Sequence, residues 1–152
     1  MQPYRVMPKP DEWSAPYWEA SNEDRLVLPQ CQHCKYFLHP LRQFCFNCSN
    51  PLPDIGYGKL SGKGKLYSFT LEYHAEINGF EDKVPFITAV IELDDQAGLR
   101  VWGNILEADY EDLTLDLPVC AVWEETGAPS GFKMMQWRPE TPIPPRTSEQ
   151  VQ

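Results

Sequence analysis

The sequence Cys31-Gln32-His33-Cys34, followed after ten residues by Cys45-Phe46-Asn47-Cys48, decides the first part of the fold. Each Cys-x2-Cys pair forms a tight knuckle that directs two sulfurs toward one ion, and a short hairpin between the knuckles brings both pairs together. The ion supplies folding free energy that so short a segment cannot obtain from burial. The spacing therefore predicts a zinc ribbon whose metal ligands are Cys31, Cys34, Cys45 and Cys48. Four thiolates leave no coordination position for water, which indicates structural zinc.

Two alternatives use the same cysteines. A rubredoxin-like iron centre has the same ligand set, and the spacing alone leaves it open. A pair of disulfides is disfavoured because the N-terminus lacks the apolar run of a secretory signal. His33 and His39 lie close to the quartet, but a complete shell of sulfurs predicts that neither is a ligand. Glycine often follows the second cysteine of a knuckle. Here Asn50 is the residue expected to tolerate a left-handed backbone, whereas Lys35 lacks that advantage.

Charge and composition limit the partners that this chain can take. The 152 residues have a formal net charge of -9 at pH 7, and 42% of them are hydrophobic. Nucleic-acid binders need a basic face, and peripheral proteins of anionic membranes need one too. No stretch approaches the ~20 apolar residues of a membrane span. We expect a cytoplasmic globular protein with no nucleic-acid partner and no membrane partner.

Beyond the cysteines the pattern changes to alternating strands. Strands are predicted over 66–73, 85–93, 99–106, 118–124 and 132–137, with a helical turn or two between 107 and 115. In the first of these strands one face consists of Tyr67, Phe69, Leu71 and Tyr73. In the second, one face consists of Ile87, Ala89, Ile91 and Leu93, and the other includes Phe86 and Val90. Five strands with a short helix after the third match an OB-fold barrel, although periodicity alone leaves other small barrels open.

The predicted organisation is all-β, with four consecutive parts. Residues 1–28 form an N-terminal arm with a short helix, 29–53 the zinc ribbon, 54–138 the OB-fold and 139–152 a Pro-rich tail. Prolines crowd both ends of the chain, and proline fixes φ and removes a backbone donor, so both termini should be extended.

From about Pro16 to Pro139 the chain resembles a known family. The matching segments are Pro16-Tyr17-Trp18, the four cysteines, Gly62-x-Gly64-x2-Tyr67-Ser68-Phe69-Thr70, Pro85-Phe86-x2-Ala89-Val90-Ile91-Glu92-Leu93 and Trp137-Arg138-Pro139. Together they are similar to the acyl-CoA-associated OB-fold proteins with an N-terminal rubredoxin-like zinc ribbon, long described as a domain of unknown function. The quartet alone would be shared with many ribbons.

The resemblance implies a non-catalytic accessory subunit in a hetero-oligomer. Its members accompany thiolase-like enzymes, acyl-CoA aldolases of the same fold, or hotdog-fold enoyl-CoA hydratases, and are thought to stabilise the partner and help form its acyl-CoA site. A thiolase or aldolase that cleaves or forms C–C bonds in a degradative pathway is the leading expectation. A hydratase partner is the alternative.

The residues themselves also indicate that catalysis lies elsewhere. Cys120 is the only cysteine outside the quartet, and its position between two apolar residues of a strand is typical of a small buried hydrophobe. His74 with Glu76 could form a base and its orienting carboxylate, but an exposed polar pair at a strand end is unremarkable. A single-stranded nucleic-acid module that stacks bases on aromatic side chains is the rival class, and the acidic charge disfavours it. Electron transfer through bound iron is a further alternative.

Two groups of residues are candidates for contacts. Lys59, Lys63 and Lys65 interleave with glycines and give a local positive charge, so they are predicted to approach the phosphates of coenzyme A at a subunit interface. The alternative is a solvated turn. Trp18, Phe37 and Phe44, with the C-terminal arm, are the predicted contacts with the partner enzyme.

Overall fold

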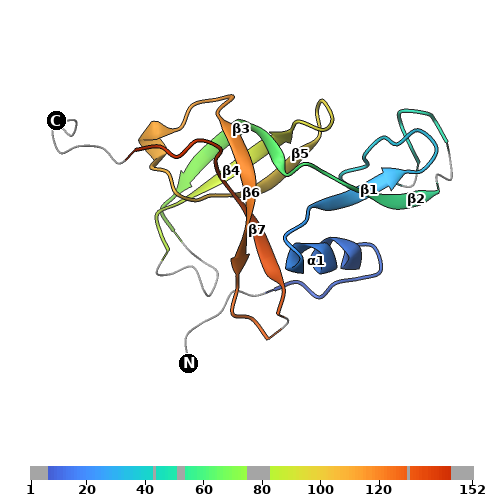
Figure 1. Cartoon of the computed structure of the whole chain (residues 1–152), viewed down its shortest axis with the longest axis horizontal. Helices are drawn as coiled ribbons and strands as arrows, with labels where there is room; N and C mark the ends of the chain where they lie inside the picture. The colour runs from blue at the N-terminus through green and yellow to red at the C-terminus, as the bar shows by residue number, and fades with distance from the viewer. Residues whose placement is uncertain (1–6, 43, 51–53, 75–82, 130, 145–152) are drawn as a thin grey trace.

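The computed structural model describes residues 7–42, 44–50, 54–74, 83–129 and 131–144. The elements in chain order are α1 (Ala15–Asn22), β1 (Val27–Cys31), β2 (Ile55–Lys59), β3 (Lys63–Glu72), β4 (Phe86–Leu93), β5 (Arg100–Ile105), the 3-10 turn η1 (Tyr110–Asp112), β6 (Pro118–Glu125) and β7 (Lys133–Pro139). Strands β3-β4-β5-β7-β6 close into a barrel, while β1 and β2 form a separate two-stranded sheet. The predicted OB-fold, preceded by a short helix and a ribbon, is confirmed (Figure 1).

Strand β4 has one face in the barrel core and one face on the outside of the barrel. Its residues alternate between half-buried and buried along the whole strand, and Ile91 is fully buried. Successive side chains of a strand point to opposite faces, so the predicted grouping of Ile87, Ala89, Ile91 and Leu93 on one face is confirmed, and this face is the inner one. β4 pairs antiparallel with β3 on one edge and with β5 on the other.

Strand β3 departs from the predicted alternation. A register shift between Leu66 and Ser68, opposite Ile91 and Val90, marks a β-bulge. Leu66 is fully buried, whereas Tyr67 is 49% exposed. The bulge adds one residue, so Phe69 and Leu71 still pack against the core while Tyr67 lies outside. The prediction that Tyr67, Phe69, Leu71 and Tyr73 share one continuous face is thus wrong, and Tyr73 is exposed as well.

Two glycines allow close approach inside the barrel. A Cβ atom at Gly64 would lie 2.5 Å from the carbonyl oxygen of Glu92, and one at Gly103 would lie 2.6 Å from Cδ1 of Trp137. Trp137 is fully buried at the centre of the main core. Only a residue without a side chain fits beside its ring at this point of β5.

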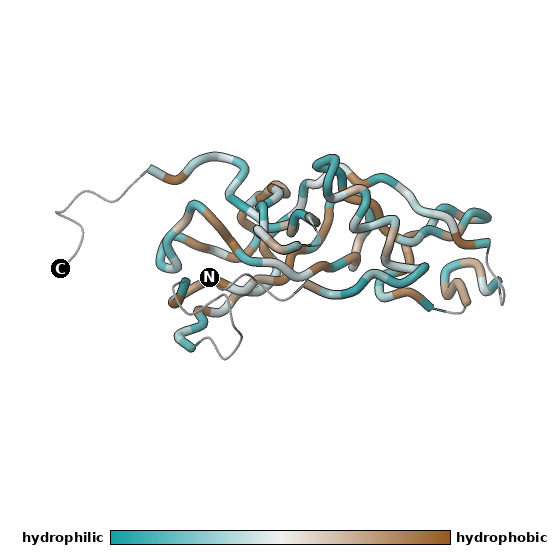
Figure 2. Tube along the Cα trace, turned by 90° about the horizontal axis from the view of Figure 1, so that it is seen from below, coloured by the Kyte–Doolittle hydropathy of each residue, from teal (hydrophilic) through white to brown (hydrophobic). Residues whose placement is uncertain are grey.

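The ribbon is attached to the barrel by shared packing and by backbone contacts. Phe37, which follows the first knuckle, belongs to the main core together with Leu26 and Leu28. The side chain of Gln96, in the β4–β5 turn, accepts a hydrogen bond from the Phe37 N–H at 2.7 Å and donates one to the Phe37 carbonyl at 3.2 Å. β2 falls within the range 54–138 that was expected for the OB-fold, yet it pairs with β1. The ribbon and the barrel lie end to end in an elongated body (Figure 2).

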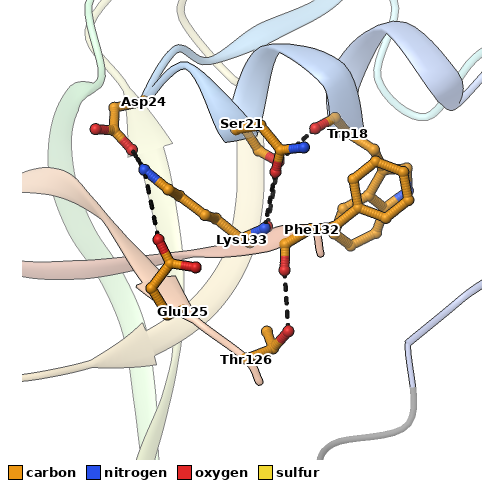
Figure 3. Close-up of polar contacts among 8 residues, drawn as sticks. Trp18, Ser21, Asp24, Glu125, Thr126, Phe132 and Lys133 are labelled. Atoms are coloured by element: carbon orange, nitrogen blue, oxygen red, sulfur yellow. Dashed lines mark hydrogen bonds and ion pairs between the residues drawn. The ribbon is translucent and has the colours of Figure 1, made fainter. Parts of the chain in front are cut away.

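Helix α1 packs on the outer end of β7 (Figure 3). The fully buried Ser21 hydroxyl lies 2.7 Å from the carbonyl oxygen of Trp18 and 3.1 Å from that of Lys133. The Lys133 ammonium group forms an ion pair with Asp24 at 2.7 Å, and its backbone N–H donates to Asn22. The helix is short, so these tertiary contacts stabilise it more than its own propensity does.

The predicted helical segment between β5 and β6 is a single 3-10 turn. The chain adopts positive φ at Glu107 and at Asp116, on either side of the turn, which prevents a longer helix. Pro139, predicted as the first residue of the tail, is the last residue of β7. Among the described residues, no helix has the length and apolarity needed to cross a bilayer.

Candidate functional site

The four predicted ligands converge on one point. One sulfur from each of Cys31, Cys34, Cys45 and Cys48 lies within 4.8 Å of all the others. The distance between sulfurs is 3.9 Å for Cys31 and Cys48 and 3.5 Å for Cys34 and Cys45. A tetrahedral ion with metal–sulfur bonds of ~2.3 Å has sulfur–sulfur edges of ~3.8 Å. The quartet therefore has the size and donor set of a metal site, and a covalent S–S bond of ~2.05 Å is absent between these pairs.

Backbone hydrogen bonds hold both knuckles. In the first, the Lys35 N–H donates to the Cys31 carbonyl at 2.8 Å. In the second, the Cys45 N–H donates to the Asn50 carbonyl at 3.1 Å. The backbone is left-handed at Lys35 (φ 62°) and at Ser49 (φ 57°), the residues that directly follow the second cysteine of each knuckle. The prediction that Asn50 has the left-handed backbone is wrong, because Ser49 has it instead.

Two of the four thiols have shifted pKa values, in opposite directions. A hydrogen bond from Asn47 lowers the pKa of the Cys34 thiol to about 6. At Cys48 the Asn50 backbone N–H opposes a rise, but desolvation and the neighbouring sulfurs together raise the pKa to about 12. Thiolates packed this closely repel one another, so all four ionise together only when a cation lies between them.

Other residues near the cysteines do not join the cluster. Within the described residues, the only group of three or more metal-ligating side chains is the quartet itself. His33 and His39 are exposed on the ribbon surface. Leu38 is fully buried against Cys31 and Cys45, so an apolar side chain shields the inner side of the site.

Two of the three lysines, Lys63 and Lys65, lie close to carboxylates. Lys59 is the last residue of β2. Lys63 and Lys65 are exposed on the outer face of β3, on either side of the buried Gly64. Lys63 forms an ion pair with Glu140, and hydrogen bonding to that carboxylate raises the pKa of the lysine. Lys65 lines a surface hollow that also contains Glu92, Asp94 and Asp116. Their contact with coenzyme A stays a prediction, and the neighbouring acids do not favour a phosphate.

The predicted aromatic contacts have three different environments. Phe37 is 8% exposed and lies in the core, so its side chain is not presented to a partner. Trp18 is half-buried and packs on Phe132, with ring centroids 5.8 Å apart. Phe44 is 53% exposed on the ribbon.

Three further aromatic residues are exposed, and two of them, both tryptophans, were missed from the sequence. Phe46 is 53% exposed between two ligands and contacts Tyr36 edge to face. Trp13, before α1, is 49% exposed, and Trp102, on β5, is 70% exposed. Alternation along β5 could have placed Trp102 outside, because its neighbour Val101 points into the core.

The structure places two of the residues considered for catalysis. Cys120 lies on β6, half-buried, between Lys63 and Arg138 in the strand register. His74 is exposed after the end of β3, and Glu76 lies outside the described residues.

Comparison with known proteins identifies relatives of this architecture. The profile of the C-terminal OB-fold domain of ChsH2 matches residues 57–124. The chain is 33% identical over 98 residues to a DUF35 domain-containing scaffold protein of Methanocaldococcus jannaschii. This alignment covers 64% of the chain and 67% of that protein. It is 27% identical over 143 residues to a probable enoyl-CoA hydratase alpha subunit of Thermomonospora curvata, covering 93% of the chain but only 42% of that protein.

Two solved structures have similar folds. A chain of the Ltp2-ChsH2(DUF35) aldolase superposes with a TM-score of 0.75 at 26% identity, covering 89% of this chain and 100% of that one. A DUF35-family protein of unknown function from Sulfolobus solfataricus superposes with a TM-score of 0.53 at 13% identity, covering 85% of this chain and 86% of that one, and shares the fold.

Proposed function

This chain belongs to the DUF35 family, and on that premise we propose that it is a non-catalytic scaffold subunit of an acyl-CoA-processing enzyme. The catalytic partner is an aldolase or another thiolase-like enzyme that cleaves or forms a C–C bond. The chain stabilises that partner and contributes to the walls of its acyl-CoA site.

One observation carries this proposal more than any other. The match to the chain of the Ltp2-ChsH2(DUF35) aldolase covers all of that chain and 89% of this one. The likeness therefore includes the ribbon as well as the barrel, and a ribbon alone would be shared with proteins of many functions.

The arrangement of reactive groups supports a non-catalytic role. Activated cysteine nucleophiles need a base within hydrogen-bond reach and an electropositive or polar setting. Four of the five cysteines are committed to the quartet. Cys120 lies on the barrel wall between Lys63 and Arg138. Each of these cations forms an ion pair with a carboxylate, Glu140 and Glu107 respectively, that offsets its charge.

We assign zinc to the quartet. The sulfur–sulfur distances suit a tetrahedral site, and when bound the ion supplies folding free energy to the ribbon. Lys35 and Ser49 hold the knuckle backbones, Asn47 hydrogen-bonds to a ligand sulfur, and Leu38 excludes water from the inner side. Rubredoxin-type iron would colour the purified protein red, whereas zinc leaves it colourless.

A hydratase partner is the alternative, and a specific observation favours it. The match to the probable enoyl-CoA hydratase alpha subunit extends over 93% of this chain. The chain spans less than half of that protein, so the remainder of its length is where a hydratase activity would be sought. A hydratase partner would use the same scaffold to support a different reaction.

The test is affinity purification of the tagged full chain from its own host, with mass spectrometry of the proteins that accompany it. Recovery of an aldolase or thiolase-like subunit in stoichiometric amount is the expected result. A hydratase subunit would favour the alternative. The proposal would be abandoned if the chain were recovered alone or with nucleic acid.

A further inference from the structure

A cleft opens where the N-terminal segment, the ribbon and the barrel meet. It has a volume of about 590 Å³, within the range of specific binding sites. Its lining is largely apolar and includes Trp13, Tyr17, Leu28, Leu41, Trp102 and Met135. These residues come from five separate stretches of sequence, so the cleft exists only in the folded chain.

Two of the tryptophans that line the cleft are largely exposed to solvent and form its rims. Trp13, from the N-terminal segment, is 49% exposed, and Trp102, from β5, is 70% exposed. A small molecule inside the cleft would leave the outer face of Trp102 in water. A protein surface would cover the cleft and both rims together, and exposed tryptophan is enriched among the residues that dominate protein interfaces.

The surface beside Trp102 is already ordered. Arg100, two residues away on the same face of β5, stacks on the Tyr67 ring at 3.6 Å. The same guanidinium donates to Glu92 on the neighbouring strand at 2.9 Å. Side chains that are fixed before binding lose little entropy on association, so this face is prepared for a rigid partner.

The part of the cleft that comes from the N-terminal segment is fixed as well. The Ser14 N–H donates to the Asp11 carboxylate at 2.8 Å, and the Asp11 N–H donates back to the Ser14 hydroxyl at 3.0 Å. The Tyr57 hydroxyl, on β2, donates to the Trp13 carbonyl. The N-terminal segment is therefore tied to the ribbon, and the separation of the two rims is set by the fold.

The negative charge beside the cleft limits the kinds of partner that it can bind. Asp11 lines it and Glu12 is exposed next to it, while the chain as a whole has a net charge of -9. Hydrogen bonds from Ser14 lower the pKa of Asp11, which keeps this carboxylate ionised. An acidic rim repels the phosphates of a nucleic acid and attracts a lysine or arginine.

We propose that this cleft is the docking site for the partner catalytic subunit, which inserts a bulky apolar side chain between Trp13 and Trp102 and places a lysine or arginine beside Asp11 and Glu12. The inference rests on the proposed function, since it names the surface by which the scaffold holds its enzyme. The two tryptophans supply the apolar contact, and the carboxylates set the orientation.

The test measures the affinity of the full chain for the subunit recovered by affinity purification. Trp102→Ala should raise the Kd at least tenfold. Asp11→Asn combined with Glu12→Gln should raise it severalfold, with the effect shrinking at high salt. Tyr73→Ala and Leu115→Ala remove exposed apolar side chains outside the cleft and should leave the Kd within about twofold. Trp102 is exposed, so its variant should keep the wild-type thermal unfolding curve.

The remaining outcomes separate the two proposals. If a catalytic subunit binds the wild-type chain and Trp102→Ala binds equally well, the cleft is not the docking site, and the scaffold function stands. If Trp102→Ala instead abolishes binding of a single-stranded oligonucleotide or self-association of the chain, the cleft serves another partner and the inference fails. If no catalytic subunit is recovered with the wild-type chain, the proposed function fails and the inference fails with it.

Discussion

At the scale of single residues, the four cysteines have the clearest consequence. Cys45→Ser removes one fully buried sulfur ligand, and a three-sulfur shell admits water and binds zinc more weakly. We expect the zinc content to fall well below one ion per chain and the ribbon to lose protection from proteolysis. Metal analysis of the purified variant, with Cys120→Ser as the matched control outside the quartet, measures this effect. Full zinc in Cys45→Ser would show that the quartet is not the ligand set.

A single ion pair on the barrel predicts a pH dependence. Hydrogen bonding from Arg100 lowers the pKa of Glu92 below its ordinary value of 4.5. A carboxylate whose pKa is lower in the folded chain stabilises the fold above its unfolded pKa, and this contribution disappears as the pH falls through the folded value. Glu92→Gln should therefore lower the Tm slightly at pH 7, because the pair is exposed to solvent, and the difference from wild type should shrink as the pH falls below 4.5.

Thermal unfolding followed by near-UV circular dichroism, which reports the aromatic core of the barrel, measures this difference. Glu19→Gln on α1 removes the same charge and is the control. A Tm difference between wild type and Glu92→Gln that stayed constant from pH 7 to pH 3 would contradict the role given to the pair.

At the scale of elements, the β4–β5 turn holds the ribbon on the barrel through one side chain. Gln96→Ala breaks both hydrogen bonds to Phe37 and leaves two backbone groups without these partners, at a cost of about 1–2 kcal/mol. We expect amide hydrogen exchange at Phe37 to accelerate about tenfold, while β4 keeps its protection. Gln96→Glu retains the acceptor for the N–H but loses the donor, so it should give an intermediate rate. Unchanged exchange in Gln96→Ala would show that core packing alone holds the ribbon.

At the scale of the whole molecule, the coenzyme A hypothesis needs the assembled complex. If Lys59, Lys63 and Lys65 meet its phosphates, replacing all three with serine should raise the KM for the acyl-CoA severalfold with little change in kcat. Lys9→Ser, which removes an exposed lysine of the N-terminal segment, is the control. Steady-state kinetics of the purified complex measures both constants. An unchanged KM would leave the three lysines as a solvated surface, as the carboxylates around Lys63 and Lys65 suggest.

Much of this architecture could be predicted without the structure, because local spacing is sufficient for it. Two Cys-x2-Cys pairs specify a four-sulfur site by their own geometry. Strand β4, which is paired on both sides, shows the uninterrupted alternation that period-two reasoning assumes. The resemblance to a family of accessory subunits also depended only on residues that can be read along the chain.

Other features depended on contacts between distant segments. The bulge in β3 exposes Tyr67, and it lies just beyond Lys65, the last residue that pairs with β6, while pairing with β4 continues to the end of the strand. Phe37 looked like a surface residue of the ribbon, but the barrel core extends beneath it. Trp13 and Trp102 are 89 positions apart and meet at one cleft only after folding. Sequence by itself determined the four-cysteine cluster and the succession of the five barrel strands along the chain, since both follow from local spacing. The tertiary structure alone decided which aromatic side chains are buried and which remain for a partner, since burial depends on every element that packs around them.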